Sequence, residues 1–561
     1  MVLSNVWSGG QLFAYSALDG DSFASDDFVG ILDSDRVGIR FFSKVKRELI
    51  LTRLGKIRPA FEGIGGDFLS LLGEKGETCR VVYARRHLIV GRLASPAAPI
   101  LLCHGDAQIL KEDDLLIQNT GDGDFSALLT RGDRFALAFG HSADTVRALA
   151  EEGVLLDADA EYEEKLALYR RFSLKEDHPY ARLYAKCLST MKTQLYSPEG
   201  NFSHTWSTPD RLPHRGLWLW DSVFHAIGFR NIDPALAQEL ILAVVDLQGD
   251  DGFIPHFANW EKRSKITQPP VLAWGARKVY EKSGDRAFLK QVYTAAARFW
   301  EWLRENRRPQ GASLYAWYTK ADKNCRCDEC GMDNSPRFDT EDTLLAIDLS
   351  CFMANEARHL AAIARELGES GEIWDQRFAE LRQEIDRILW SEEDGFYFDY
   401  NLKKGAHHKV WAVSSFLPLL AGICSPKQAE ALLGHLQDPE SFATPFSVPS
   451  ISKKDATFGS DMWRGPVWIN YNYMIIEGLE QYGFEECARS LRENTLSTVN
   501  FWYRKGGVLF EFYDSENCRA PWELNRKGPP FEPYDFEIRP QAIRDYGWSN
   551  TLTFDLLSRE V

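Results

Sequence analysis

The sequence lacks several features that would place it in other classes of protein. No uninterrupted apolar run reaches the roughly 18 residues that a membrane-spanning helix requires. The first ten residues have neither the basic start nor the continuous apolar core of a secretory signal. Basic residues are in deficit, because 65 Lys and Arg face 81 Asp and Glu and leave a formal charge of -16. We therefore expect neither a membrane nor nucleic acid as a partner, since both attract basic surfaces.

Two common catalytic motifs are also missing from the chain. There is no Gly-x-x-x-x-Gly-Lys loop to cradle phosphates and no Gly-x-Ser-x-Gly nucleophile elbow. The chemistry therefore needs no nucleotide or organic cofactor, and none is predicted. Ten cysteines are spread along a chain without an export signal, which favours reduced thiols and a cytoplasmic location over a disulfide framework.

A zinc site is one interpretation of the cysteines near the middle of the chain. Cys325, Cys327 and Cys330 are close in sequence, and Cys351 is a possible fourth ligand. The spacing lacks the second matching pair of a structural zinc site, and Cys351 falls in an apolar stretch that predicts a helix. Reduced loop thiols are the preferred interpretation, so no metal ligand is predicted.

Aromatic residues, in contrast, are abundant. They make up 13% of the 561 residues and include 17 Trp. Trp rings stack on the C–H faces of sugars, but they also fill large hydrophobic cores. The enrichment is therefore compatible with a saccharide cleft and with ordinary core packing.

The hydrophobic pattern changes along the chain and predicts two domains joined by a linker. Residues 1–160 contain short alternating runs, such as 36–42, 80–83 and 100–102, between Asp-Gly and Gly-Gly turns. This pattern predicts an antiparallel β-sandwich domain. The charged stretch 161–177 predicts a helical linker, and helical periodicity then runs through 178–561.

About twelve helices are expected in this second part. They include 180–195, 234–247, 267–282, 286–306, 341–367, 374–390 and 468–482. Twelve helices in one domain predict an (α/α)6 barrel, in which six inner and six outer helices surround a funnel. Loops at one end of such a barrel would carry the functional residues.

Two acidic segments suggest the chemistry. One is 329–339 (ECGMDNSPRFD), which places Asp333 among Gly, Asn, Pro and Arg, and the other is 510–514 (FEFYD), which contains Glu511. Cleavage of a glycosidic bond generally needs two carboxyl groups, so this pair predicts a glycoside hydrolase. Each residue also has a purely structural interpretation, since Asp-Asn-Ser-Pro is good turn chemistry and Glu511 could be the outward residue of a strand.

Four segments of the helical part carry a resemblance to a known family. They are 219–225 (LWDSVFH), 248–256 (QGDDGFIPH), 331–337 (GMDNSPR) and 463–470 (WRGPVWIN). Their order and spacing, supported by 267–270 (TQPP) and by Trp548-Ser549, resemble glycoside hydrolase family 63. The resemblance implies an (α/α)6 barrel, α-linked substrates and inversion at the anomeric carbon.

The resemblance also implies roles for individual residues. Asp333 matches the general acid of a Glu-Ser-Gly-x-Asp pattern, in which this chain has Cys330 in place of Ser. Glu511 matches the general base, although the Gly that usually follows shortly afterwards is missing. Trp220, Asp221, Trp463 and Arg464 match the sugar subsite, unless Asp221 and Arg464 are only an internal ion pair. Further candidate binding residues are Gln248, Asp251, His256, Gln268, Trp468 and Arg337, the last of which is expected to brace the Asp333 loop.

We therefore predict an inverting, exo-acting α-glycosidase acting on a small α-glycoside or oligosaccharide. Two other classes stay open: an epimerase or phosphorylase on the same helical barrel, and a catalytically silent saccharide-binding protein. Glucose or mannose specificity, the leaving group and the oligomeric state are not determined by the sequence.

Overall fold

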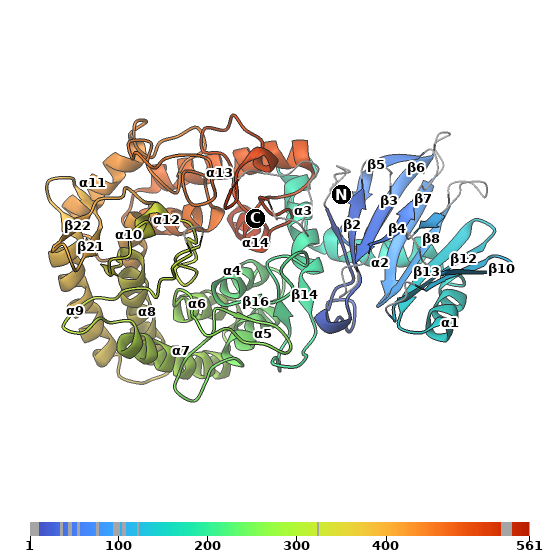
Figure 1. The fold of residues 1–561 in the computed structure, drawn as a ribbon, viewed down its shortest axis with the longest axis horizontal. Helices are drawn as coiled ribbons and strands as arrows, with labels where there is room; N and C mark the ends of the chain where they lie inside the picture. The colour runs from blue at the N-terminus through green and yellow to red at the C-terminus, as the bar shows by residue number, and fades with distance from the viewer. Residues whose placement is uncertain are drawn as a thin grey trace.

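A part built of β-sheets and a ring of helices lie side by side in the computed structural model of the chain (Figure 1). The structure describes residues 11–33, 38–42, 48–52, 57–73, 78–93, 101–103, 108–119, 123–322, 325–528 and 541–559. No helix among these residues is long and apolar enough to cross a membrane.

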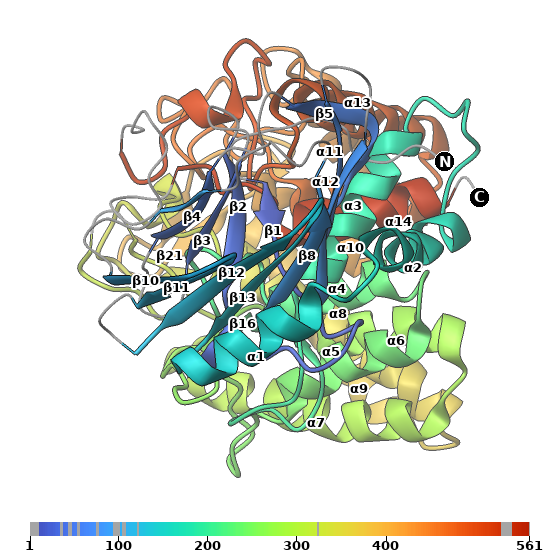
Figure 2. The ribbon, with the colours of Figure 1, turned by 90° about the vertical axis from the view of Figure 1, so that its right-hand side faces the viewer.

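Two antiparallel sheets form the N-terminal part (Figure 2). In spatial order the first contains β1 (Leu12–Phe13), β2 (Val29–Asp33), β3 (Gly38–Phe42), β4 (Glu48–Thr52) and β9 (Leu101–Cys103). The second contains β10 (Gln108–Glu112), β11 (Leu115–Asn119), β12 (Phe125–Arg131), β13 (Arg134–Gly140), β8 (Leu88–Arg92), β7 (Thr78–Arg85), β6 (Phe68–Gly73) and β5 (Ile57–Ile64).

An aromatic core lies between the two sheets. Phe13, Phe28 and Phe41 come from the first sheet and its loops, and they pack against Tyr83 and Phe139 of the second. The ring centroids of Phe41 and Phe139 are 4.8 Å apart, and those of Phe13 and Tyr83 are 5.9 Å apart. Burying one face of each sheet against the other makes a β-sandwich, which confirms the predicted fold of this region.

The three strand segments predicted in this region are observed wherever the structure describes them. The run 36–42 contains β3, with 36 and 37 outside the described residues, and 80–83 lies inside β7. The run 100–102 overlaps β9, and position 100 is not described.

Two helices connect the sandwich to the ring. α1 (Ala143–Gly153) packs on β12 and β13, and α2 (Ala158–Arg171) packs on β7 and β8. The predicted charged linker 161–177 therefore includes most of α2. The domain boundaries at 160 and 178 stay a prediction.

Twelve α-helices follow in the described part of the chain, between residues 181 and 558. The inner ring consists of α4 (Leu219–Phe229), α6 (Leu272–Ser283), α8 (Ile347–Glu366), α10 (Leu417–Ala421), α12 (Ile469–Gln481) and α14 (Gly547–Ser558). Each contacts the next in this order, and α14 contacts α4 and closes the ring. The outer helices are α3 (Ala181–Thr193), α5 (Pro234–Val245), α7 (Arg286–Asn306), α9 (Glu372–Leu389), α11 (Pro426–Gln437) and α13 (Glu485–Gly506).

This alternation of inner and outer helices is the predicted (α/α)6 barrel. The inner helix α4 has every side chain buried, whereas the outer helix α7 buries one stripe, as its position requires. α7 has the bounds predicted from the sequence because Asp285 caps it, accepting bonds from the backbone N–H groups of Ala287 and Phe288. α8 starts at Ile347 rather than at 341, since the short strand β18 (Leu344–Leu345) precedes it.

Long loops at the N-terminal ends of the inner helices position the site. Residues 325–346 lead into α8, and residues 507–528 and 541–546 lie between α13 and α14. Short strands and 3-10 turns shape these and other loops: β14 (Leu195–Tyr196), β15 (Trp206–Ser207), β16 (Leu217–Trp218), β17 (Phe257–Ala258), β19 (Trp390–Ser391), β20 (Phe396–Tyr397), β21 (Asp399–Asn401), β22 (Ala406–His408), η1 (Ala24–Asp26), η2 (Pro336–Phe338), η3 (Val413–Phe416) and η4 (Pro521–Glu523).

Candidate active site

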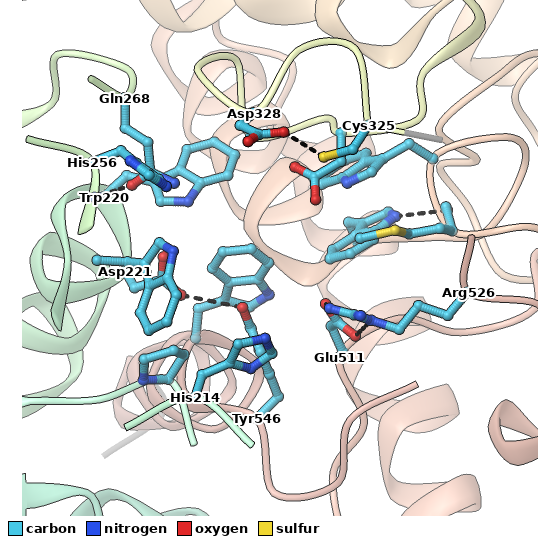
Figure 3. Close-up of a pocket in the computed structure, with 18 of the residues that line it drawn as sticks. His214, Trp220, Asp221, His256, Gln268, Cys325, Asp328, Glu511, Arg526 and Tyr546 are labelled. Atoms are coloured by element: carbon cyan, nitrogen blue, oxygen red, sulfur yellow. Dashed lines mark hydrogen bonds and ion pairs between the residues drawn. The ribbon is translucent and has the colours of Figure 1, made fainter. Parts of the chain in front are cut away.

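A cavity opens at the end of the barrel where several inner helices begin (Figure 3). Its volume is about 210 Å³, which is smaller than the typical site for a drug-sized ligand. Its lining is rich in Trp and in charged side chains. The lining residues are Pro209, His214, Trp218, Trp220, Asp221, His256, Gln268, Cys325, Asp328, Gly331, Asp333, Met462, Trp463, Trp468, Glu511, Arg526, Lys527, Tyr546 and Trp548.

The first turn of α4 forms one side of the cavity. Gln268 Oε1 accepts a hydrogen bond of 3.3 Å from the backbone N–H of Trp220, and the hydroxyl of Tyr546 donates to Asp221 Oδ1 at 3.4 Å. Burial raises the pKa of Asp221 well above its ordinary value. The carboxyl therefore keeps its proton into a range where a free Asp is ionised, and it can both donate to and accept from ligand hydroxyls.

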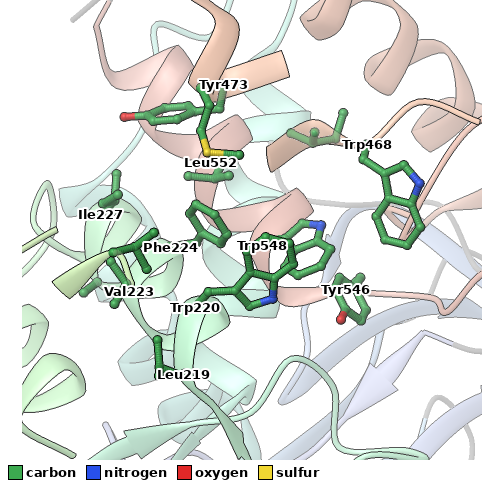
Figure 4. Packing of buried hydrophobic residues seen from close by; sticks show 14 of the residues in the cluster. Leu219, Trp220, Val223, Phe224, Ile227, Trp468, Tyr473, Tyr546, Trp548 and Leu552 are labelled. Carbon is green, nitrogen blue, oxygen red and sulfur yellow. The ribbon is translucent and has the colours of Figure 1, made fainter. Parts of the chain in front are cut away.

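Aromatic rings from three elements converge on the same space (Figure 4). Trp463 and Trp468 stack in parallel, with centroids 3.8 Å apart and planes 3° apart. Trp548 of α14 meets Trp220 edge to face at 5.4 Å. The indole N–H groups of Trp463 and Trp548 are buried and have no hydrogen-bond partner among the described residues. A buried donor without a partner is costly, so the packing of the rings has to offset these two N–H groups.

The loop before α8 presents Asp333 to the cavity. Gly331 has φ +73, and a Cβ there would lie 2.2 Å from Cζ2 of Trp220, so glycine lets the loop pack on that ring. Asn334 fixes the loop on its other side, since Oδ1 accepts from the backbone N–H of Trp463 at 3.0 Å and Nδ2 donates to Asp461 at 3.2 Å. Asp333 is held between these two anchors.

Two buried charged side chains, Glu329 and Arg337, stiffen the same loop behind the cavity. Glu329 accepts backbone N–H bonds from Thr267 and Tyr318 at 3.2 and 3.0 Å. Arg337 is fully buried and donates to Asp348 and Asp399 at 2.6 to 2.9 Å. The loop is therefore rigid, as a site with fixed geometry requires.

Glu511 reaches the cavity from the loop before α14. It is buried, and its backbone N–H donates to Ile543 O at 2.9 Å while Oε2 accepts from the N–H of Ile543 at 3.3 Å. Arg526 donates to both carboxylate oxygens, at 2.8 and 3.2 Å (Figure 3). Burial alone would lower the pKa of Arg526, but Glu511 raises it above its usual range. The pair is a bidentate ion pair in the cavity wall.

The residue after Arg526 bonds the other acid. Lys527 Nζ lies 2.7 Å from Asp333 Oδ2 and 3.3 Å from the thiol of Cys325. Asp461 holds the turn, because its carboxylate accepts from the backbone N–H groups of Lys527 and Gly528 at 2.8 and 3.1 Å. Two neighbouring cations on one turn thus join Glu511 and Asp333.

Comparison with known proteins identifies the family of the chain. Residues 214–549 match the family model described as a mannosylglycerate hydrolase MGH1-like glycoside hydrolase domain. The match covers more than half of the 561 residues. The chain belongs to this family. It is a glycoside hydrolase of family 63.

Individual relatives support the family and the fold. A mannosylglycerate hydrolase of Rubrobacter radiotolerans is 25% identical, over 61% of this chain and 94% of the relative. The family 63 mannosylglycerate hydrolase of Thermus thermophilus, solved with glucose, has a TM-score of 0.55 and 24% identity over 66% of this chain and 99% of its own. A bacterial glucoamylase solved with acarbose is 12% identical, has a TM-score of 0.61 and covers the whole of this chain and 95% of its own.

Of the twelve predicted site residues of this family 63 hydrolase, eight line the cavity. These are Asp333, Glu511, Trp220, Asp221, His256, Gln268, Trp463 and Trp468. His256 bonds the hydroxyl of Ser264 at 2.6 Å, and burial lowers its pKa despite the nearby Asp328 and Asp333. The imidazole of His256 at the cavity edge is therefore neutral.

The other four predicted residues are not among those that line the cavity. Gln248 donates to the carbonyls of Gly252 and Ala295 at 3.0 and 2.9 Å. Asp251 accepts from the indole N–H of Trp302 at 3.1 Å, and Arg464 pairs with Asp339 at 2.5 Å. Arg337 lies in the buried ion-pair network described above. In this structure these side chains support loops, and Arg464 pairs with Asp339 rather than with Asp221.

Several lining residues of the hydrolase escaped the sequence analysis. His214, Trp218, Arg526, Lys527 and Tyr546 were not proposed. Tyr546 is two residues from Trp548, which belonged to the family resemblance, and this neighbourhood could have identified it. No pattern around Arg526 and Lys527 indicates that they meet two carboxylates from other segments.

The cysteines near the middle of the chain have different surroundings. Cys327 and Cys330 are fully buried, and Cys351 lies within α8. Among the described residues, one group of three potential metal-ligand atoms comes from Cys325, Asp328 and Asp333, which lie within 4.8 Å of one another. Lys320 pairs with Asp328, and Lys527 with Asp333, so ammonium groups already neutralise both carboxylates.

Proposed function

We propose that the protein is an inverting, exo-acting α-glycosidase with Asp333 as general acid and Glu511 as general base. The observation that carries this proposal is that two carboxyl groups, from loops far apart in the sequence, line one cavity in a glycoside hydrolase. Each acid comes from a loop that leads into an inner helix, so each can be held in a fixed position. Trp and polar side chains surround both acids, as a saccharide site requires.

In the proposed reaction the carboxyl of Asp333 protonates the glycosidic oxygen. Glu511 accepts a proton from a water molecule, and this water attacks the anomeric carbon from the opposite face of the ring. The leaving alcohol departs with the proton of Asp333, and the sugar leaves with inverted configuration. Inversion needs roughly 6.5–9.5 Å between the two carboxyl groups, which leaves space for the water.

The two cations have different roles in this proposal. Arg526 bonds both oxygens of Glu511 and orients the base. Lys527 pairs with Asp333 in the structure. A general acid must carry its proton and face the leaving oxygen, so Lys527 releases Asp333 when the substrate binds.

The substrate we propose is a small α-mannoside or α-glucoside. The curated relative is named for mannosylglycerate, and the solved family 63 structure contains glucose. A cavity of about 210 Å³ suits a single hexose with a small aglycone rather than a long polysaccharide. Asp221, which lines the cavity, supplies a partner for a hexose hydroxyl.

Proton NMR of the first sugar released tests the proposal. The purified protein is incubated with α-glucosides and α-mannosides, among them trehalose, kojibiose, glucosylglycerate and mannosylglycerate. We expect the β-anomer to appear before mutarotation. An α-anomer released first would overturn the Asp333 and Glu511 mechanism. A sugar phosphate formed only with added phosphate would indicate a phosphorylase, and an isomer of the intact substrate an epimerase. Ligand binding without turnover across the panel would indicate a saccharide-binding protein.

A further inference from the structure

A buried ion pair joins the β-sandwich to the cavity end of the barrel. Asp27 lies just before β2 and is 6% exposed. Its Oδ2 accepts from Arg211 Nη1 at 2.8 Å and from the hydroxyl of Tyr196 at 2.6 Å. Arg211 is fully buried, and its second Nη donates to the carbonyls of Tyr15 and Leu195 at 2.7 and 2.9 Å. The guanidinium thus forms hydrogen bonds both to the N-terminal part and to the segment that follows α3, and these bonds hold it in one orientation.

The segment around Arg211 forms part of the cavity wall. Its neighbour Asp210 is buried and accepts from the backbone N–H and from Nδ1 of His214, at 3.0 and 2.8 Å. The hydroxyl of Thr208 lies within hydrogen-bond distance of the carbonyls of Asp210 and His214. Pro209 and His214 both line the cavity. Residues 208–214 are therefore one hydrogen-bonded unit with Arg211 inside it.

A second link runs from the sandwich to the neighbouring wall segment that carries Tyr546. The backbone N–H of Leu12 in β1 donates to Asp545 Oδ2 at 3.1 Å, and Lys186 of α3 pairs with Oδ1 at 2.8 Å. Asp545 directly precedes the cavity residue Tyr546. The amide of Gln194 bridges both links, since it donates to Pro209 O at 3.0 Å and to Asp545 O at 2.6 Å. The two wall segments are thus tied to each other as well as to the sandwich.

Most of these contacts lie outside the part of the chain that matches the family. The family match begins at residue 214, and the sandwich, Tyr196 and Arg211 all precede it. We propose that the β-sandwich holds part of the active-site wall in place. Asp27 acts through Arg211 as a positioning residue for the wall segment that carries Pro209 and His214. The inference rests on the proposed function only in taking this cavity as the place where the glycoside binds.

An ion pair between the sandwich and α2, away from the cavity, separates positioning from general stabilisation. Arg85 of β7 donates to both carboxylate oxygens of Glu161 in α2, at 2.8 and 3.1 Å. The side chain of Arg85 is 48% exposed, whereas Arg211 is fully buried, and neither Arg85 nor Glu161 lines the cavity. Glu161→Gln therefore removes the carboxylate of an ion pair without touching the wall.

The test compares Asp27→Asn with Glu161→Gln in the full-length protein. Amide hydrogen exchange is measured by mass spectrometry on peptides covering 206–218 and 541–550. We expect exchange in 206–218 to accelerate about tenfold or more in Asp27→Asn and to be unchanged in Glu161→Gln. Steady-state kinetics use an α-glycoside that the wild-type protein hydrolyses. We expect the KM for this substrate to rise about tenfold in Asp27→Asn while kcat changes less than about threefold. Unchanged exchange and KM in a folded Asp27→Asn protein would overturn the inference.

A milder variant decides the question if Asp27→Asn does not fold. Tyr196→Phe removes one of the two hydrogen bonds to Asp27 and keeps the ion pair with Arg211. We expect faster exchange in 206–218 and a KM about threefold higher, and wild-type values for both would overturn the inference. Hydrogen exchange requires no substrate, so a wild-type protein that hydrolyses no α-glycoside would remove the proposed function while this measurement still decides the role of Asp27.

Discussion

At the scale of single residues, some buried polar groups in the cavity wall have hydrogen-bonding capacity that the described residues do not use. The indole N–H groups of Trp463 and Trp548 are buried and unpartnered among the described side chains. Burial keeps the carboxyl of Asp221 protonated above its ordinary pKa range, so it can donate as well as accept. The carboxyl of Asp221 lines the cavity, where it can bond to a ligand hydroxyl. A site with such buried polar groups rejects ligands that lack the matching hydroxyl, because the groups then stay unpaired.

Removing either proposed catalytic carboxyl should stop turnover without unfolding the protein. We expect Asp333→Asn and Glu511→Gln each to lower kcat by about a thousandfold or more, because proton transfer at the leaving oxygen or at water is lost. Steady-state kinetics on the substrate found by NMR measures this, with the melting temperature as a check on folding. Glu516→Gln, which changes a 37%-exposed carboxylate in the same loop as Glu511, should keep wild-type activity. A near wild-type rate in either test variant would remove that residue from the mechanism.

At the scale of helices, the contact between α4 and α14 closes the ring beneath the cavity. His225 of α4 is fully buried, and its Nδ1 bonds the hydroxyl of Ser207 at 2.7 Å. A Cβ on Gly547 would lie 2.1 Å from His225 Nε2, so α14 approaches α4 more closely there than any other residue type allows. Asp221 at the start of α4 and Trp548 at the start of α14 are positioned by this contact.

The burial of His225 should make the stability of the ring depend on pH. Burial lowers the pKa of His225 from 6.5 to about 3, so the folded protein favours the neutral ring. The contribution of His225 to the free energy of unfolding is fully present above pH 6.5. It is lost as the pH falls toward 3, because only the unfolded chain takes up the proton. Between about pH 7.5 and pH 5 wild type should lose about 2 kcal/mol of unfolding free energy relative to His225→Gln. Urea denaturation of both proteins measures it, and parallel pH profiles would contradict the assignment.

At the scale of the whole molecule, α3 serves as the contact surface between barrel and sandwich (Figure 1). Lys192 of α3 is 2% exposed and pairs with Asp67 at 2.6 Å and with Asp19 at 2.9 Å. Burial would raise the pKa of Asp19, but Lys192 and Lys165 outweigh it and lower the pKa below its ordinary value. The charges are therefore compensated inside the interface. Buried pairs of this kind specify one relative orientation of the two parts.

Breaking this network should destabilise the whole chain. Lys192→Met leaves the buried Asp67 with only the more distant ammonium of Lys165, at 3.7 Å, and we expect a loss of about 3 kcal/mol of unfolding free energy. Lys403→Met, which removes an 81%-exposed partner of Asp342, should cost less than about 1 kcal/mol. Scanning calorimetry measures both and should show one unfolding transition in wild type. Two separate transitions would mean that sandwich and barrel unfold independently.

Much of the fold could be predicted because it depends on local patterns. The capping residue Asp285 and the apolar stripe behind it define α7 within the chain itself. The predicted start of α8 was wrong, since residues 341–346 have helix-compatible composition but contain β18, which pairs with the distant β21. A pairing between segments far apart in sequence leaves no local pattern.

The sequence by itself determined the order of sandwich and barrel, the family, and the two acids Asp333 and Glu511 as candidates, because periodicity and motif are properties of neighbouring residues. Only the tertiary structure decided that Arg526 and Lys527 meet those acids, that Arg337 points into a buried network and that Asp27 reaches the cavity wall through Arg211. These contacts join segments up to 194 positions apart, as in Asp333 with Lys527. Charge pairing acts through space, so its partners are determined by how the chain folds and not by their order along it.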